Sequence, residues 1–465
     1  MHGVHFSTLP TSLTPPINAD AGLIVAVGTA PVNLGDPNNV NKIKLCYTYD
    51  EAISAFGDSD DFAKYTLSEV IYSQFKLFNV APIVLINVLD PVEHKTSISA
   101  ESKTLVNNQA KLSNLGAIKS SVVVKVAAAT KVLGTDYTLS FNDDGYLLVN
   151  RLSSGSIAAN ATLLVDYDVL DPTAVTSADI IGGFSSNAYT GIELLDQVYP
   201  QTRKVPMQLI APKYSKDPVV AAIMRAKVNK VNGLFGCAAL VDIDETVATD
   251  YSQAPAYKVQ NNLTDEHMDV YYGTAHLGEM KFHLSTQDAS LTQRIYAEDG
   301  GNVYRSSSNN SLQMNGFSQN GVKGFLTLNQ ANYLNDNGIK TALNWTKWAL
   351  WGNKTSAYPN TADPVKVFRQ QRNLFNWIGN SLILTYFEKV DNPTNRVLIE
   401  SVILSESVKL NGLTARGVIL GGRIEFRDID NPTTDLLAGK IRFRILLAGP
   451  LPAEDIEFML EFDTT

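Results

Sequence analysis

The sequence predicts a multidomain protein of mixed α/β and α+β class. A discontinuous α/β domain carries an inserted all-β domain and is followed by a C-terminal α+β domain, with extended arms at both termini. Continuous apolar runs alternate with segments of helical spacing, which is typical of a sheet covered on both faces. A block rich in strands and turns interrupts this alternation. The last part of the chain combines a long helix with strands of period two.

Residues 1–20 predict an extended N-terminal arm. In GVHFSTLPTSLTPP, Val4 and Phe6 alternate with polar residues, which indicates a short strand. Three prolines follow, and because proline has no backbone N–H, such a segment cannot lie in the middle of a sheet. We therefore expect an arm with an edge strand at Val4 and Phe6, the alternative being a disordered terminus.

The α/β domain is expected over residues 20–92 and 173–340. The apolar runs LIVAVGTAP and APIVLINVLDP predict buried strands before the interruption, and KVPMQLIAP and FGCAALVDID predict buried strands after it. Between the last two, DPVVAAIMRAKVNKV predicts a helix. Asp217 is its expected N-cap, and Pro218 occupies its first position.

Residues 93–172 predict an all-β domain inserted into a loop of the α/β domain. The segments SSVVVKVAAA, TDYTLSF and ATLLVDYDVL are typical of strands, and NDDGY between alternating segments is a hairpin signal. The same tetrapeptide, VLDP, stands at both ends of the block, at Val88–Pro91 and Val169–Pro172. We therefore interpret the block as an insertion.

Residues 341–450 predict a C-terminal α+β domain whose longest helix spans DPVKVFRQQRNLFNWIGNSLILTYF. This stretch contains no acidic residue after its first aspartate, yet Lys366, Arg369 and Arg372 recur every three residues. The apolar face of the helix consists of Val367, Phe368, Leu374, Phe375 and Ile378. The basic residues lie largely away from that face, so we expect them to point outward. They form either an ordinary polar face or a contact for an acidic partner.

Residues 451–465 predict a strand-forming C-terminal arm. Apolar residues recur at every second position of DIEFMLEFD, which is the period of a β-strand. They are Ile456, Phe458, Leu460 and Phe462. Because the backbone N–H and C=O groups of a strand need partners, this strand pairs either within the chain or with another chain.

Composition excludes some classes of protein. The chain has 465 residues and a net charge of −9, which argues against a protein built mainly to hold nucleic acid. Cys46 and Cys237 lie far apart in apolar settings, and we expect both to be buried free thiols. We recognise no targeting or membrane-spanning segment, so we expect a soluble protein made in a cytoplasm.

The sequence offers no catalytic template. It contains no nucleophile elbow, zinc-protease motif, phosphate-binding loop or dinucleotide fingerprint. His267, His276 and His283 are spaced by nine and seven residues, which does not fit a helical metal pair. The acids at the end of the strand FGCAALVDID are Asp242, Asp244 and Glu245. Strand ends often carry acids in α/β enzymes, but a solvated loop is the simpler interpretation. We expect no catalytic residue, no metal and no cofactor.

Long strings of characteristic sequence follow one another along the chain. They include NYLNDNGIKTALNW, WGNKT, NLFNWIGNSLILTY, KVDNPTNRVLIES, LNGLTARGVILGGRIEF and DNPTTDLLAGKIRFRILLAGPLPAEDIEF. The N-terminal GVHFSTLPTSLTPPINADAGLIVAVGTAP and the strand-rich LGTDYTLSFNDDGYLLV precede them. Together these strings resemble contractile phage tail sheath proteins. The resemblance spans most of the chain and is densest in its C-terminal part.

The resemblance implies a structural role. Sheath subunits form stacked six-subunit rings around a tail tube, and the sheath contracts to drive the tube through the host envelope. The expected partners are other copies of the chain, the tail tube protein, and the baseplate and tail terminator proteins. Direct nucleic-acid contact, membrane insertion and a cofactor are not expected. The expected location is the virion tail, assembled in the host bacterial cytoplasm.

The resemblance also implies roles for particular residues. Both arms would pair with a small sheet of neighbouring copies, near GGRIEFRDI or GKIRFRILLA. The arm residues involved would be Val4, Phe6, Ile456, Phe458, Leu460 and Phe462. Thr11–Ile17 and Gly449–Ala453 would serve as flexible linkers. A tube-facing helix would place Lys366, Arg369 and Arg372 against the tube, and the inserted domain would lie on the outside of the tail.

Three alternatives stay open. The chain could form the sheath of a phage-derived bacteriocin or a related injection particle, which the sequence does not separate from a phage tail. An α/β hydrolase would use the acids near Asp242 and would need a compact monomer with a pocket. A surface or adhesin-like β-protein is disfavoured by the α/β blocks and by the lack of a signal peptide.

Overall fold

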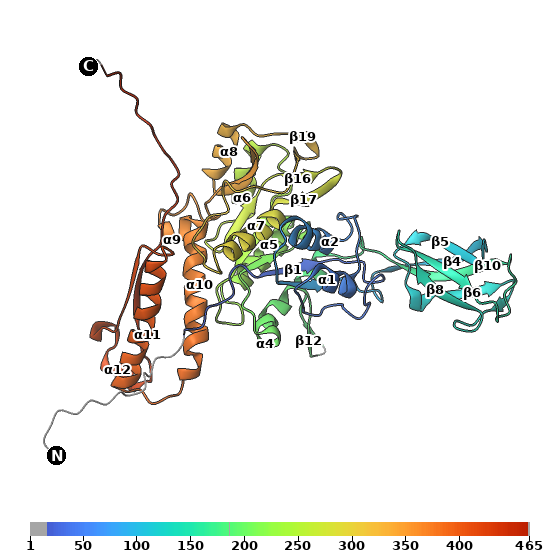
Figure 1. Ribbon diagram of the computed structural model, residues 1–465, viewed down its shortest axis with the longest axis horizontal. Coiled ribbons are helices and arrows are strands. Elements are labelled where there is room, and N and C mark those ends of the chain that lie inside the picture. Colours follow the sequence, from blue (N-terminus) through green and yellow to red (C-terminus); the bar gives the residue numbers. More distant parts are fainter. Residues whose placement is uncertain (1–15, 186, 464–465) are drawn as a thin grey trace.

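The computed structural model describes residues 16–185 and 187–463, and its centre is an eight-stranded sheet (Figure 1). The strand order is β2-β3-β1-β13-β14-β15-β20-β21. These strands are β1 (Ile24–Gly28), β2 (Lys44–Cys46), β3 (Ile83–Asn87), β13 (Gln208–Ile210), β14 (Ala238–Asp242), β15 (Met268–Tyr271), β20 (Ile339–Asn344) and β21 (Trp348–Trp351). The strands from β3 to β20 run parallel, whereas β2 and β21 pair antiparallel at the two edges.

The central strands are buried because their sequences are almost entirely apolar. Every residue of β1, β3 and β14 is buried, as expected for parallel strands covered on both faces. The helices of this domain are α1 (Tyr49–Phe56), α2 (Thr66–Ile71) with a π-helical turn after it (Tyr72–Leu77), α3 (Ser177–Ile181), α4 (Val198–Thr202), α5 (Pro218–Val228), α6 (Ala254–Gln260), α7 (Leu284–Glu298) and α8 (Leu328–Asn335). Helix α5 begins as the sequence predicts, with Asp217 accepting a hydrogen bond from the Val219 N–H.

Smaller sheets complete the α/β domain. An antiparallel sheet follows the order β17 (Met280–His283), β16 (Thr274–Leu277), β18 (Gly316–Gln319) and β19 (Val322–Gly324). A short hairpin joins β11 (Phe184–Ser185) to β12 (Ala188–Tyr189). Both lie outside the central sheet and enlarge the domain without altering its strand order.

Residues 95–170 form two antiparallel sheets that project from the α/β domain (Figure 1). One sheet has the order β4 (Lys95–Thr104), β10 (Thr162–Leu170), β6 (Val123–Val126) and β7 (Ala129–Thr130). The other has the order β5 (Gln109–Leu115), β9 (Tyr146–Arg151) and β8 (Tyr137–Phe141). Their apolar faces enclose a core of their own, separate from the core of the α/β domain.

Helices dominate the end of the molecule opposite this β-structure (Figure 1). The elements are α9 (Pro364–Val367), α10 (Arg369–Tyr386), α11 (Arg396–Ala415), β22 (Gly421–Glu425), α12 (Thr433–Leu437) and β23 (Arg444–Ala448). Strands β22 and β23 form a two-stranded antiparallel sheet, with Gly421 opposite Ala448 and Glu425 opposite Arg444. The sheet packs on α11.

Two predictions about this region are wrong. A domain boundary at 340/341 would cut β20, which pairs with β15 inside the central sheet, so the α/β domain continues through β21. The helix predicted from Asp363 is also not continuous. Phe368 is extended, with φ −86° and ψ 120°, and separates α9 from α10. The cause lies in a distant segment, because Lys354 forms a β-bridge with Phe368.

Candidate assembly surfaces

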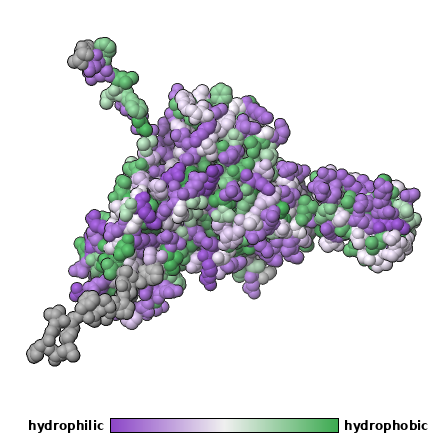
Figure 2. Space-filling model, viewed as in Figure 1, coloured by the Kyte–Doolittle hydropathy of each residue, from purple (hydrophilic) through white to green (hydrophobic). Residues whose placement is uncertain are grey.

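The segment 455–462, here called the free arm, leads away from the body of the molecule (Figure 1). Its alternating apolar residues are exposed, from 68% at Ile456 to 98% at Leu460. Figure 2 shows hydrophobic residues along the free arm where it leaves the body. The predicted strand does not form within the described residues, because no other segment pairs with it. Its pairing with a neighbouring copy stays a prediction, and Val4 and Phe6 lie outside the described residues.

The two-stranded sheet β22–β23 offers backbone edges that no described strand occupies. Its inner face is covered: Ile424 is buried, and Gly422 lies so close to Leu410 that an added Cβ would stand 3.1 Å from that side chain. Its strands fall in GGRIEF and RILLA, the segments expected to contain the receiving edge. An unpaired edge beside an apolar surface is a template for strand addition.

Exposed apolar side chains continue over the rest of this end of the molecule. Helix α11 buries Val402, Leu410 and Leu413 on one face. On the opposite face, Val397, Leu404 and Val408 are each more than half exposed. Further exposed residues are Phe387, Val390, Leu420, Ile429, Leu437 and Leu451. A helix that is apolar on two opposite faces is typical of one that packs on both sides.

The basic residues of the long helix do not point outward as predicted. Arg369 is only 6% exposed, and its Nε lies 2.8 Å from an Asp269 carboxylate oxygen. Arg372 lies 2.8 Å from Glu266, which is also 3.3 Å from Lys366. The outward orientation is therefore wrong for Arg369 and Arg372, whereas the Lys366 side chain is half exposed. Contact of these residues with a tube stays a prediction.

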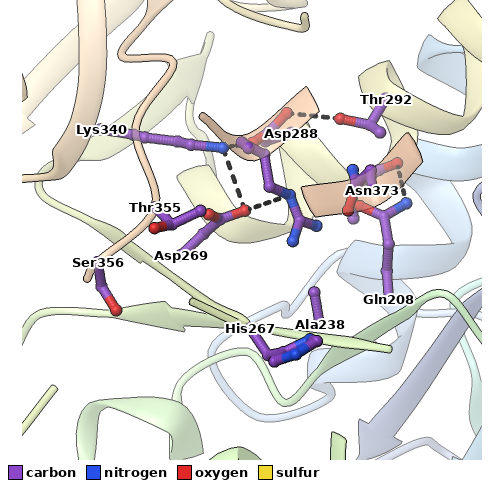
Figure 3. A network of polar contacts seen from close by, with 12 residues as sticks. Gln208, Ala238, His267, Asp269, Asp288, Thr292, Lys340, Thr355, Ser356 and Asn373 are labelled. Carbon is purple, nitrogen blue, oxygen red and sulfur yellow. Dashed lines mark hydrogen bonds and ion pairs between the residues drawn. The ribbon is translucent and has the colours of Figure 1, made fainter. Parts of the chain in front are cut away.

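Arg369 belongs to a buried charge network through its ion pair with Asp269. Figure 3 shows Asp269, Lys340 and Asp288 of this network close together. Lys340 Nζ lies 3.1 Å from both Asp269 and Asp288, and Tyr271 donates a hydrogen bond to Asp288. Burial by itself would raise the pKa of Asp288, but the Lys340 charge and several hydrogen bonds outweigh it and leave that pKa lowered. The four charges compensate one another, which buried ions require. The network fixes α10 to strands β15 and β20 of the central sheet.

Sequence reasoning missed this network, although two signals were present. Asp269 lies in MDVY, which is buried throughout, and Lys340 lies in IKTAL, the buried part of β20. A charge at such a position requires a partner of opposite charge. The sequence alone does not say that the partner of Asp269 is an arginine one hundred residues away, at the start of α10.

The other candidate residues serve local structure. Asp242 accepts hydrogen bonds from the Ser285 N–H and hydroxyl, which fixes the start of α7. Glu245 accepts from Thr274 and from the Asn320 N–H. His267, His276 and His283 bond separately to Cys237 O, Ser318 and Glu69. Within residues 16–185 and 187–463 no group of His, Cys, Asp and Glu side chains could hold a metal ion. Over the same residues, no helix is both long and apolar enough to cross a membrane.

Comparison with known proteins gives one consistent answer, although no family model matches the chain. The tail sheath protein of Burkholderia phage BcepMu is 28% identical over 99% of this chain and 96% of its own length. The sheath of the contractile injection system PVC, in its contracted state, has a TM-score of 0.60 at 14% identity, covering 100% of this chain and 98% of that one. The contracted helical sheath of the anti-feeding prophage has a TM-score of 0.58 at 14% identity, covering 100% and 99%.

The solved structures share the fold of this chain along its whole length, so the fold is that of a contractile sheath subunit. The relatives in phages extend the similarity to the sequence itself. Sequence similarity over nearly the whole chain and the shared fold together support a contractile tail sheath family.

Proposed function

We propose that the chain is the structural subunit of a contractile sheath, belonging either to a phage tail or to a phage-like contractile injection system. The observation that carries this proposal is the coexistence of two incomplete surfaces in one chain. The free arm exposes an alternating apolar face, and the sheet β22–β23 has unoccupied edges within the described residues. With the arm extended away from the body, no described part of the same chain covers its apolar face or pairs with the edges of β22–β23.

Strand addition between copies completes both surfaces at once. Each copy donates an arm and receives one, which is a head-to-tail contact that generates rings or helical arrays. Burial of one large apolar side chain contributes about 1.5–3 kcal/mol, and the free arm offers four on one face. Backbone hydrogen bonds add geometric register, because a shift by one residue would turn the apolar face to solvent.

The finer parts of the proposal rest on the similarity to sheath proteins. The copies assemble as stacked six-subunit rings around a tail tube, with baseplate and tail terminator proteins at the two ends, in the virion tail. Contraction proceeds through subunit contacts and requires no catalytic residue or cofactor. Among the predicted tube contacts, Lys366 has the most accessible side chain, since Arg369 and Arg372 are largely engaged within the chain.

The test is electron microscopy of the purified chain and of two arm variants. The full chain is expected to form tubes or stacked rings. A variant with Phe458→Glu and Phe462→Glu is expected to stay unassembled, because it places two charges on the face to be buried. Met459→Glu is the matched control, since Met459 is equally exposed but lies on the other face of the strand. Purified tail tubes serve as nuclei if the full chain alone does not assemble. Normal tubes from the double variant would contradict the arm mechanism.

A further inference from the structure

Helix α10 holds the segment from which the free arm departs. Gln370 and Gln371, in its first turn, both donate hydrogen bonds to the Pro450 carbonyl oxygen. Gly449 lies against the same helix, since an added Cβ would stand 2.3 Å from Gln371 Oε1 and 2.7 Å from Leu374. Glu454 is 3.7 Å from Lys354 Nζ, which also pairs with Asp336. Residues 449–454, here called the C-terminal root, are therefore docked on the body.

The segment that follows the N-terminal arm is docked on the other end of α10. The Ile17 N–H donates to Thr385 Oγ1 at 2.9 Å, and the Ala19 N–H donates to Ser381 Oγ at 2.9 Å. The indole N–H of Trp377, a fully buried side chain, donates to the Ala19 carbonyl oxygen at 3.0 Å. Trp377, Ser381 and Thr385 are four residues apart and lie on one face of the helix. Residues 17–19 are here called the N-terminal root.

We propose that α10 is a common mount for both arms, and that the C-terminal arm pivots at Asp455, beyond its docked root. The helix rises about 1.5 Å per residue, so Gln371 and Thr385 stand about 21 Å apart along its axis. The mount is itself fixed to the α/β domain by the Arg369–Asp269 ion pair and by Asn380, which exchanges two hydrogen bonds with Gly236. A pull on either arm is thus carried by one helix and by the central sheet behind it.

Because residues 449–454 are docked, they are not the flexible linker predicted at Gly449–Ala453. The linker predicted at Thr11–Ile17 is shorter, because Ile17 is docked. It rests on the proposed function only for the use of the arms between copies. The docking of the two roots is a property of the single chain. The arms then change direction between copies while their points of departure keep a fixed spacing, so subunits can reorient without lengthening their connections.

A Glu-specific protease tests the C-terminal pivot on the unassembled full chain. Three glutamates, Glu454, Glu457 and Glu461, lie within eight residues and serve as internal controls for one another. Cleavage needs a mobile extended backbone, so we expect cuts after Glu457 and Glu461 at least tenfold faster than after Glu454, with sites identified by intact mass. Equal rates at all three glutamates would overturn the proposal.

Two glycine variants sharpen this test. Gly449→Ala pushes Gln371 away from Pro450 and is expected to raise the cutting rate after Glu454 towards that at Glu457. Gly412→Ala on α11 is the matched control, because a Cβ there meets nothing within 4 Å, and it is expected to leave all three rates unchanged. An unchanged rate after Glu454 in Gly449→Ala would show that Gln371 does not hold the root, and would overturn the mount at this end.

Hydrogen–deuterium exchange tests the N-terminal root in the same unassembled chain. The amides of Ile17 and Ala19 are expected to be protected, and Thr385→Val is expected to speed exchange at Ile17 at least tenfold while leaving Ala19 protected. Unprotected amides in the unmodified chain would overturn the mount at that end. Because neither readout requires tubes, these outcomes are independent of whether the chain forms a sheath.

Discussion

The β-structure at residues 95–170 and the C-terminal segment at residues 387–463 are of similar length and lie at opposite ends of the molecule (Figure 1). Their surfaces differ. The β-structure exposes five large apolar residues, Val106, Leu115, Val123, Val132 and Leu133. The C-terminal segment exposes fifteen, namely Phe387, Val390, Val397, Leu404, Val408, Leu420, Ile429, Leu437, Leu446, Leu451, Ile456, Phe458, Met459, Leu460 and Phe462.

The two regions differ in how the backbone groups and the apolar faces of their strands find partners. The β-structure closes its two sheets on a core of its own and covers an outer face with pairs such as Lys125–Asp166 and Lys95–Asp168. The C-terminal segment leaves a two-stranded sheet with open edges, and its free arm pairs with no strand among the described residues. One region is complete as a single chain, whereas the other leaves strand edges and apolar side chains uncovered among the described residues, as the proposed strand addition between copies requires.

The largest effect is expected from deleting each region in turn. Removal of residues 455–465 should abolish self-assembly, because it removes the donated strand. Removal of residues 95–170, with a short Gly-Ser bridge, should leave assembly intact, because that region supplies its own core. Sedimentation of polymers with electron microscopy measures both. Loss of assembly in the second deletion, with a folded monomer, would show that the β-structure also joins copies.

A smaller effect is expected at the junction between the two domains. Arg369→Met should lower the free energy of unfolding by about 3–5 kcal/mol, because it leaves Asp269 buried with one cation in place of two. Lys366→Met should change it by less than about 1 kcal/mol, since that pair is exposed. Chemical denaturation followed by circular dichroism compares the two variants. Equal effects would show that the buried network does not stabilise the junction.

The smallest expected effect is the pH dependence of stability that Glu266 contributes. Burial would raise the pKa of Glu266, but hydrogen bonding and charge from Arg372 and Lys366 outweigh it and lower the pKa in the folded chain. The resulting stabilisation is present above the ordinary glutamate pKa and is lost as pH falls through the folded value. We therefore expect Glu266→Gln to reduce stability near pH 7 and to have less effect below pH of about 4. Unfolding midpoints measured across this range check the sign, and an effect that grows on acidification would contradict it.

Much of the local structure follows from the sequence because its causes are local. The apolar run at β1 and the Asp217–Pro218 start of α5 give a strand and a helix where expected. The alternation from Ile456 to Phe462 identifies the apolar face of the arm, although no described segment pairs with it. Local patterns of this kind depend on neighbours within a few residues.

The failures share a different cause. The break at Phe368 depends on Lys354, the burial of Arg369 depends on Asp269, and the docking of Pro450 depends on Gln371. The deciding partner lies 14 residues away for Phe368, 100 residues away for Arg369 and 79 residues away for Pro450, so the periodicity of the element itself does not reveal the interaction. The helix itself contains no acid near Arg369 and Arg372, as the sequence indicates. Their acidic partners are Asp269 in β15 and Glu266 in the loop before it.

The strands that begin and end the β-structure lie next to each other. Lys95, the first residue of β4, stands opposite Leu170, the last residue of β10. The chain therefore leaves the α/β domain and returns to it at nearly the same point. The inserted residues thus require almost no separation between the two ends of the α/β domain that they connect. Such a junction is a natural exchange point in evolution and in engineering. Domains of other origin, joined through closely spaced ends, could be displayed there without redesign of the sheet from which they emerge.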